Sequence, residues 1–128
     1  MVTATMPNLF THDIDVAVAF YRDQLGFSES YRVPADGRPE HVVLRLGGSL
    51  LAISTPGAAV AAGLNPKGGN PLEIIVWCDD VNGETARLRR AGATVAVEPY
   101  DHPAGHRRAY VTDPDGNWLA LVDAPAPS

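Results

Sequence analysis

Residues 13–26 read DIDVAVAFYRDQLG and residues 80–92 read DVNGETARLRRAG, and these two stretches decide the fold. Each begins with an aspartate, which is a favoured helix N-cap, and ends with a glycine, which is favoured just after a helix. Apolar residues, with one threonine, recur at steps of three and four, as on one face of a helix: Ile14, Ala17, Val18, Tyr21 and Leu25, then Val81, Thr85, Leu88 and Ala91. The two aspartates lie 67 positions apart, so the sequence predicts two helices in a duplicated unit.

Short apolar or alternating segments flank both helices and predict strands at 6–11, 27–33, 41–46, 49–54, 72–78, 94–98, 108–112 and 118–123. The segment DPDGN at 113–117 is typical of a hairpin turn, because proline presets one backbone angle and glycine supplies a positive φ. The order βαβββ therefore occurs twice, which predicts an α+β fold of two modules. One helix covers only one face of a four-stranded sheet, so the other face must be buried or bind something.

The predicted organisation is a first module over 1–55, a linker over 56–71 and a second module over 72–128 that ends in a short disordered tail at 124–128. The linker is rich in glycine, proline and alanine. It is either a plain connector or a mobile lid beside the uncovered sheet face.

Composition excludes several classes of protein. The chain has 128 residues, a net charge of −5 and one cysteine, Cys78. A single cysteine excludes an internal disulfide and a thiolate-rich zinc site, and the acidic balance argues against nucleic acid as a partner. No apolar run is long enough for a membrane span, and the N-terminus has no secretory pattern, so we expect a cytoplasmic protein that contacts no membrane.

The segments DIDVAVAFYRDQLGF at 13–27 and AGHRRAYVTDPDGNWLAL at 104–121 resemble the vicinal-oxygen-chelate superfamily. This superfamily includes glyoxalase I, the extradiol dioxygenases and the bleomycin-resistance proteins. The resemblance implies two βαβββ modules whose curled mixed sheets surround a concave groove, in a homodimer.

The resemblance also implies four metal-ligand positions, which here hold Met6, Ala52, Glu73 and Ala120. Only one carboxylate remains, whereas a divalent metal needs three or four donors. We therefore expect no metal and no cofactor. The MPNL start at 6–9 and the missing ligands are similar to the antibiotic-binding, bleomycin-resistance-like branch.

Strand alternation predicts which side chains face the groove, because successive residues point to opposite faces. The predicted ligand-binding set within the strands is Asn8, Phe10, His41, Arg45, Ser54, Glu73, Trp77, Tyr110 and Trp118. His102 joins it from the loop 100–106, which could close over the groove. His102 and His106 have the i, i+4 spacing of half a metal site, but Pro103 and Gly105 lie between them and oppose a helix.

Each of these residues also has a plainer interpretation. Trp77 and Trp118 could pack at a dimer interface instead of contacting a ligand. Glu73 is either a solvated carboxylate or a proton acceptor, Arg45 either anchors a ligand oxygen or forms a salt bridge, and His41 could be a surface imidazole.

Aromatic side chains with a few polar groups suit a flat, partly polar small molecule. The leading hypothesis is a non-catalytic protein that confers resistance by sequestering an aromatic, peptidic or glycosylated antibiotic. The alternative is a metal-independent isomerase or cyclase that uses Glu73 or a histidine. A metal-dependent lyase or dioxygenase fits the residues least well.

Overall fold

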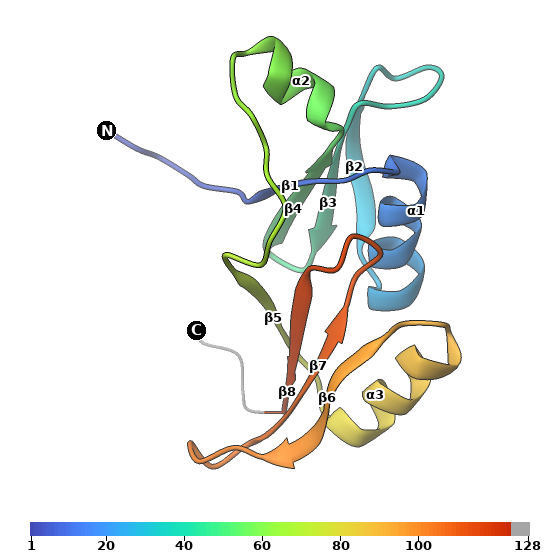
Figure 1. Cartoon of the computed structure of the whole chain (residues 1–128), viewed down its shortest axis with the longest axis vertical. Helices are drawn as coiled ribbons and strands as arrows, with labels where there is room; N and C mark the ends of the chain where they lie inside the picture. The colour runs from blue at the N-terminus through green and yellow to red at the C-terminus, as the bar shows by residue number, and fades with distance from the viewer. Residues whose placement is uncertain (124–128) are drawn as a thin grey trace. The chain divides into compact units, whose positions relative to one another are not determined.

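The computed structural model describes residues 1–123, so the predicted tail at 124–128 lies outside the described residues. Backbone contacts divide the chain into two compact units, Met1–Gly68 and Gly69–Ser128 (Figure 1). Among the described residues, no helix has the length and apolar character needed to cross a membrane. Each unit is described by itself below.

The N-terminal unit contains a four-stranded mixed sheet with strand order β1-β4-β3-β2. Its elements in chain order are β1 (Asn8–Phe10), α1 (Ile14–Ala19), η1 (Phe20–Gln24), β2 (Ser28–Val33), β3 (His41–Leu46) and β4 (Ser49–Ser54). β1 runs parallel to β4, whereas the other neighbours are antiparallel. The helical segment lies along one face of this sheet (Figure 1).

The first predicted helix is present but changes geometry along its length. The Asp13 side chain caps α1 by accepting a hydrogen bond from the Val16 N–H at 3.3 Å, as expected for an N-cap. After Ala19 the chain continues as the π-helix η1, a change that the apolar spacing did not predict. Tyr21 is fully buried and packs edge-to-face on Phe27, with ring centroids 5.9 Å apart.

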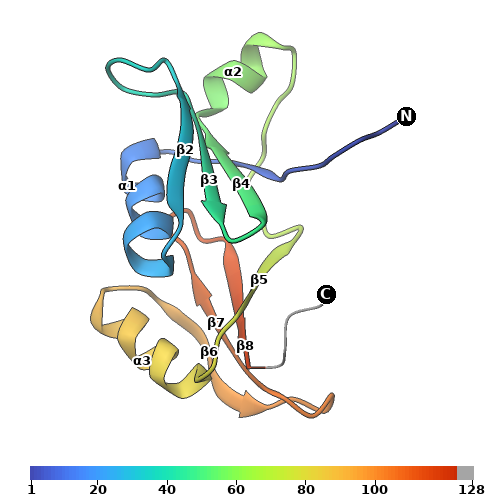
Figure 2. The same ribbon diagram turned by 180° about the vertical axis from the view of Figure 1, so that it is seen from behind.

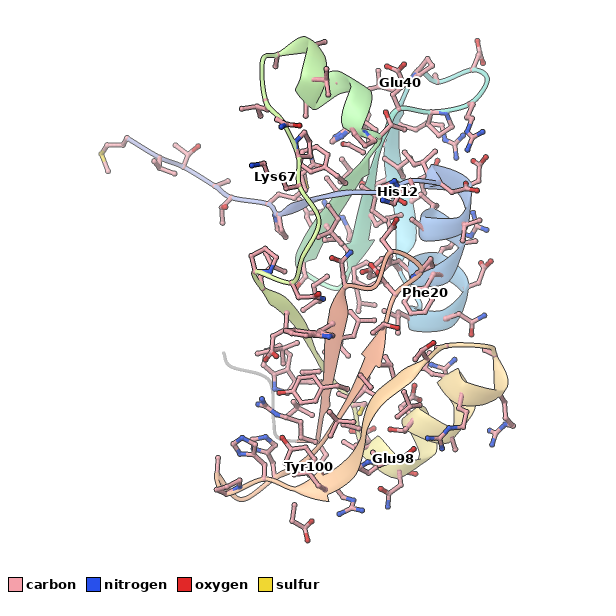
Figure 3. All side chains as sticks on the ribbon, viewed as in Figure 1. His12, Phe20, Glu40, Lys67, Glu98 and Tyr100 are labelled. Carbon is pink, nitrogen blue, oxygen red and sulfur yellow. The ribbon has the colours of Figure 1, made fainter. Side chains whose placement is uncertain are left out.

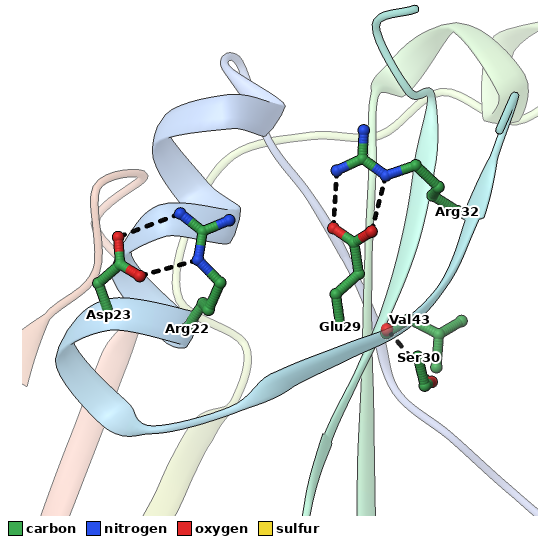
Figure 4. A network of polar contacts seen from close by, with 6 residues as sticks. All are labelled: Arg22, Asp23, Glu29, Ser30, Arg32 and Val43. Atoms are coloured by element: carbon green, nitrogen blue, oxygen red, sulfur yellow. Dashed lines mark hydrogen bonds and ion pairs between the residues drawn. The ribbon is translucent and has the colours of Figure 1, made fainter. Parts of the chain in front are cut away.

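The edge strand β2 carries a β-bulge that the alternation pattern did not predict. Glu29 pairs with Leu44 and Tyr31 pairs with Val43, so one extra residue, Ser30, is inserted. The bulge brings Glu29 and Arg32 to the same face, where two hydrogen bonds of 2.7 Å join their side chains (Figure 4). These bonds lower the pKa of the Glu29 carboxyl below its ordinary value.

The C-terminal unit repeats this arrangement with strand order β5-β8-β7-β6. Its elements are β5 (Glu73–Trp77), α3 (Val81–Arg90), β6 (Val95–Asp101), β7 (Arg107–Thr112) and β8 (Trp118–Val122). Figure 2 shows α3 along one side of this sheet, where it packs on β6, β7 and β8. The predicted α+β class, with two four-stranded mixed sheets, is confirmed.

Local signals set the ends of the second unit's helix and hairpin. The Asp80 side chain caps α3 by accepting from the Gly83 N–H at 3.0 Å, and Gly92 follows the helix with φ +100°. Asp113 is buried, and its Oδ1 accepts hydrogen bonds from the backbone N–H groups of Asp115 and Asn117. This closes the predicted turn between β7 and β8.

The predicted linker contains a short helix, α2 (Pro56–Ala61). Proline is well suited to the first helical position, since its missing N–H would have no helical partner there. The alanine-rich residues that follow favour the helical conformation.

Candidate functional site

The outer face of each sheet is the face turned away from the helix of the same unit. In the C-terminal unit, strand register arranges the outer face in three rows. The rows are Glu73, Trp118 and Thr112; then Ile75, Ala120, Tyr110 and Val97; then Trp77, Val122, Arg108 and Tyr100. The predicted facing of β5, β7 and β8 therefore agrees with the observed register.

A cavity of about 400 Å³ opens on this outer face. Its lining side chains come from β5, β6, β7 and β8, and they are Glu73, Ala96, Val97, Tyr110 and Trp118. Trp118 leaves 42% of its surface exposed, so part of its indole ring is available to a ligand. The site thus combines an available aromatic surface with one carboxylate, a phenol and aliphatic side chains.

Arg108 joins two of the lining residues. Its Nη1 donates a hydrogen bond to the Tyr110 hydroxyl at 3.0 Å and lies 3.8 Å from Oε1 of Glu73. The hydrogen bond to Tyr110 is the main cause that raises the pKa of the Arg108 guanidinium, so this group keeps its positive charge. Ala120 lies in the row between Glu73 and Arg108, and its methyl group leaves room for the arginine to reach across.

Two histidines stack at the tip of the β6–β7 hairpin, close to Tyr100, which Figure 3 labels. The rings of His102 and His106 lie 4.6 Å apart and nearly parallel. His102 Nδ1 accepts from the Ala104 N–H at 3.0 Å, and His106 Nε2 accepts from Nε of Arg108 at 3.2 Å. Burial, followed by the charges of Arg108 and His106, lowers the pKa of His102 below its ordinary 6.5.

His102 lines a second cavity, of about 390 Å³, and not the first one. Its lining residues are Asp101, His102, Gly105, His106, Arg107 and Asp123. The guanidinium of Arg107 already has protein partners, since it donates to the side chains of Asn82 at 2.8 Å and Asp101 at 2.9 Å. Polar side chains that line this second cavity therefore already form hydrogen bonds within the protein.

Three predicted residues of the N-terminal unit form a hydrogen-bonded chain on its outer face. The Ser54 hydroxyl donates to Oδ1 of Asn8 at 2.8 Å and lies 2.6 Å from Nδ1 of His41. Strand register pairs Ser54 with His41, and it pairs Asn8 with Ala52, two residues before Ser54 on the same face of β4. Phe10 and Arg45 share this face and are exposed.

The structure therefore brings together only part of the predicted set. Glu73, Tyr110 and Trp118 line one cavity. Trp77 lies on the same face of the sheet but does not line the cavity. Asn8, His41 and Ser54 form a separate cluster within the N-terminal unit. Whether any of these residues binds a ligand stays a prediction.

Two kinds of site residue are absent from the predicted set. Ala96 and Val97 are consecutive and both line the cavity, because register shifts interrupt the alternation of β6. Arg108 lies on the outer face of β7, as the alternation predicts. Its ion pair with Glu73, however, forms only because its long side chain extends from β7 past β8 to β5. No pattern within one strand reveals that link.

The metal-ligand positions implied by the resemblance do not fit a metal centre. Ala52 and Ala120 are fully buried methyl groups, and the carboxylate of Glu73 is paired with Arg108. Met6 offers only a thioether, which is a poor ligand for hard divalent cations. Within residues 1–123, no three His, Cys, Asp or Glu side chains gather closely enough to hold a metal ion.

Comparison with known proteins identifies a family. The model of the Glyoxalase/Bleomycin resistance protein/Dioxygenase superfamily matches residues 3–121. The CFP32 proteins of Mycobacterium tuberculosis and Mycobacterium bovis, which carry the provisional name glyoxylase, are each 29% identical over 123 residues. That match covers 93% of this chain but 42% of each relative, so the chain spans less than half of their length.

Several solved structures share the fold. TioX from Micromonospora sp. ML1 is 28% identical, with a TM-score of 0.76 over 94% of this chain and 98% of TioX. A superfamily enzyme from Burkholderia phytofirmans has a TM-score of 0.80 at 24% identity, over 94% of this chain and 97% of that one. Lactoylglutathione lyase from Agrobacterium tumefaciens has a TM-score of 0.69 at 24% identity, over 97% of this chain and 96% of the lyase.

Proposed function

Because the chain belongs to the Glyoxalase/Bleomycin resistance protein/Dioxygenase superfamily, we propose that it binds a small molecule without converting it and so withholds that molecule from its target. The ligand is an antibiotic with an aromatic, peptidic or glycosylated structure. The binding site includes the outer-face cavity of the C-terminal unit, lined in part by Glu73, Tyr110 and Trp118.

The observation that carries this proposal is the exposed ring of Trp118 in a cavity of about 400 Å³. That volume lies within the usual range for sites that bury small organic ligands. An aromatic ligand placed on the indole removes apolar surface from water on both partners, which favours binding without any bond chemistry. The methyl group of Ala120 stands where the resemblance implies a metal ligand, which supports binding over metal-dependent catalysis.

The experiment is a thermal-shift screen of the purified protein against a panel of antibiotics, because a ligand that binds only the folded state raises the melting temperature. Tryptophan fluorescence then gives the affinity of each hit, and mass spectrometry examines the ligand after prolonged incubation. We expect a selective hit that is recovered with unchanged mass. A chemically altered ligand would refute sequestration, and the absence of any hit would refute antibiotic binding.

A metal-independent enzyme is the second candidate, favoured by the 2.6 Å contact between Nδ1 of His41 and the Ser54 hydroxyl. Because the Ser54 hydroxyl donates to Asn8, Nδ1 of His41 donates to Ser54, and this tautomer leaves Nε2 as the ring nitrogen that can accept a proton from a substrate, as isomerisation or cyclisation requires. In this case the hit would be converted to an isomer or a cyclised product. The variant Ser54→Ala would then lose turnover and still bind the ligand.

We also propose that the protein is a cytoplasmic homodimer. Trp77 and Ile75 are exposed on the outer face beside the cavity, and large apolar side chains at a surface are typical of interfaces. Sedimentation equilibrium of the purified protein should give twice the 13.6 kDa chain mass. A monomer at micromolar concentration would contradict the dimer and leave the cavity proposal intact.

A further inference from the structure

The ion pair beside the cavity leaves hydrogen-bonding capacity on both of its members. Oε1 of Glu73 and Nη1 of Arg108 are 3.8 Å apart, which is longer than a hydrogen bond. The two side chains are 32% and 17% exposed, so both charges are partly removed from water. Within residues 1–123, the Glu73 carboxylate accepts no hydrogen bond and is held only by this ion pair.

The hydrogen bonds of Arg108 go to His106 and Tyr110 and not to the carboxylate. Its Nη1 donates to the Tyr110 hydroxyl and its Nε donates to His106. Its Nη2 donates to no residue among those that the structure describes. Arg108 therefore brings a donor close to the Glu73 carboxylate and to Tyr110, and these two residues line the cavity together with the partly exposed indole of Trp118.

The positive charge of Arg108 and the negative charge of Glu73 cancel, so this pair favours ligand groups that carry no net charge. An anionic ligand group would bind Arg108 but would approach Glu73, and a cationic group would meet the reverse conflict. Leaving one partly buried charge without its partner is costly. A neutral group that has an N–H donor next to a carbonyl acceptor satisfies both residues without disturbing the balance.

We propose that the site recognises a planar ligand through the neutral edge of an amide or lactam. The N–H of that edge donates to Glu73, its carbonyl oxygen accepts from Arg108, and the attached ring lies against Trp118. This inference rests on the proposed function, since it names the chemical class of ligand for the same cavity. Ala120 permits it, because a larger side chain would stand between Glu73 and Arg108.

Three bicyclic probes of nearly equal size test the proposal by titration of tryptophan fluorescence. 2-Quinolone carries the N–H and the carbonyl, 1-methyl-2-quinolone lacks the donor, and quinoline-2-carboxylate carries a negative charge. We expect 2-quinolone to bind wild-type protein at least about tenfold more tightly than either of the others, which corresponds to about 1.4 kcal/mol.

The variant Glu73→Gln tests the charge balance, because it keeps the side-chain shape and removes the negative charge. We expect it to bind quinoline-2-carboxylate more tightly than wild type by about fivefold or more, since Arg108 is then no longer offset. Glu98→Gln is the matched control: Glu98 lies in the same unit on β6, does not line the cavity and pairs with Arg89. It should leave the affinities of all three probes unchanged.

The outcomes separate this inference from the proposed function. Equal affinities for 2-quinolone and its N-methyl derivative, or no gain for the carboxylate in Glu73→Gln, would overturn the amide-edge proposal alone. If none of the probes binds while the antibiotic screen yields a hit, the amide edge is again wrong and sequestration stands. If neither the probes nor the screen gives binding, both proposals fail.

Discussion

The guanidinium of Arg108 donates a hydrogen bond of 3.0 Å to the hydroxyl of Tyr110, and its central carbon lies 6.0 Å from the centre of the Tyr110 ring. The two residues are two positions apart on β7, so they share the outer face of the sheet. This relationship orients a charge next to the cavity that Tyr110 helps to line. It also connects the cavity to the histidine pair through the bond from Arg108 to His106.

Removing the Tyr110 hydroxyl should weaken this arrangement without removing the aromatic ring. We expect Tyr110→Phe to lower the free energy of unfolding by about 0.5–1.5 kcal/mol, which is the usual net contribution of one hydrogen bond. Urea unfolding measures this change. Tyr31→Phe is the control, because Tyr31 is exposed on the edge strand β2. An equal loss in both variants would show that the Tyr110 bond contributes nothing specific.

The two tryptophans of the sheet should differ in their effect on ligand binding. Trp118 lines the cavity, whereas Trp77 lies two rows away on the same face. We expect Trp118→Ala to weaken binding of a hit from the antibiotic screen by about 1–3 kcal/mol, because a large aromatic contact is lost. Trp77→Ala should change the dissociation constant less than about threefold. Calorimetric titration measures the dissociation constants. A larger loss of affinity in Trp77→Ala than in Trp118→Ala would contradict the assignment of the cavity as the binding site.

Acid should destabilise the hairpin that carries the two histidines. The pKa of His102 is lowered in the folded protein, so the unfolded chain binds more protons as the pH falls through the ordinary value of 6.5. Stability linked to this residue is therefore present above pH 6.5 and is lost below it. NMR titration of the His102 ring should give a midpoint below 6.5.

The variant His102→Asn supplies the control for this pH effect. Its amide oxygen can replace the ring nitrogen as acceptor for the Ala104 N–H, but it does not titrate. We expect the difference in unfolding free energy between pH 7.5 and pH 5.5 to be smaller in this variant than in wild type. An unchanged difference would assign the acid sensitivity to other groups.

The effects on stability of changing Asp80, the N-cap of α3, and Gly83, whose N–H it binds, should depend on each other. Asp80→Ala should cost about 1 kcal/mol of stability through loss of the N-cap. A β-carbon at Gly83 would lie 2.4 Å from Oδ2 of Asp80, so Gly83→Ala must displace the capping carboxylate. In Asp80→Ala that conflict is absent, and the higher helix propensity of alanine remains.

We therefore expect the double variant of Asp80 and Gly83 to be more stable than the sum of the two single changes predicts. Thermal or urea unfolding of the four proteins gives this coupling directly. Asp13→Ala serves as a second cap variant for comparison, because the Asp13 carboxylate accepts from the N–H of Val16 instead of a glycine, although it also accepts from Arg38 at 3.2 Å. Strict additivity would contradict the steric argument.

Much of the fold could be predicted because its signals act within a few residues. Asp13 and Asp80 cap the helices, and the turn around Asp113 joins β7 to β8, as the local sequence indicates. Features that depart from regular spacing were missed. These are the π-helix after Ala19 and the bulge at Ser30, where packing and pairing partners override the local period.

The sequence by itself determined the two βαβββ modules and the alternation that turns Glu73, Tyr110 and Trp118 to the outer face. Only the tertiary structure decided that these three line one cavity, and that Arg108 stands between Glu73 and His106. The physical reason is that alternation is a property of a single strand. Contact between side chains on different strands depends on register, on bulges and on the size of the residues between them.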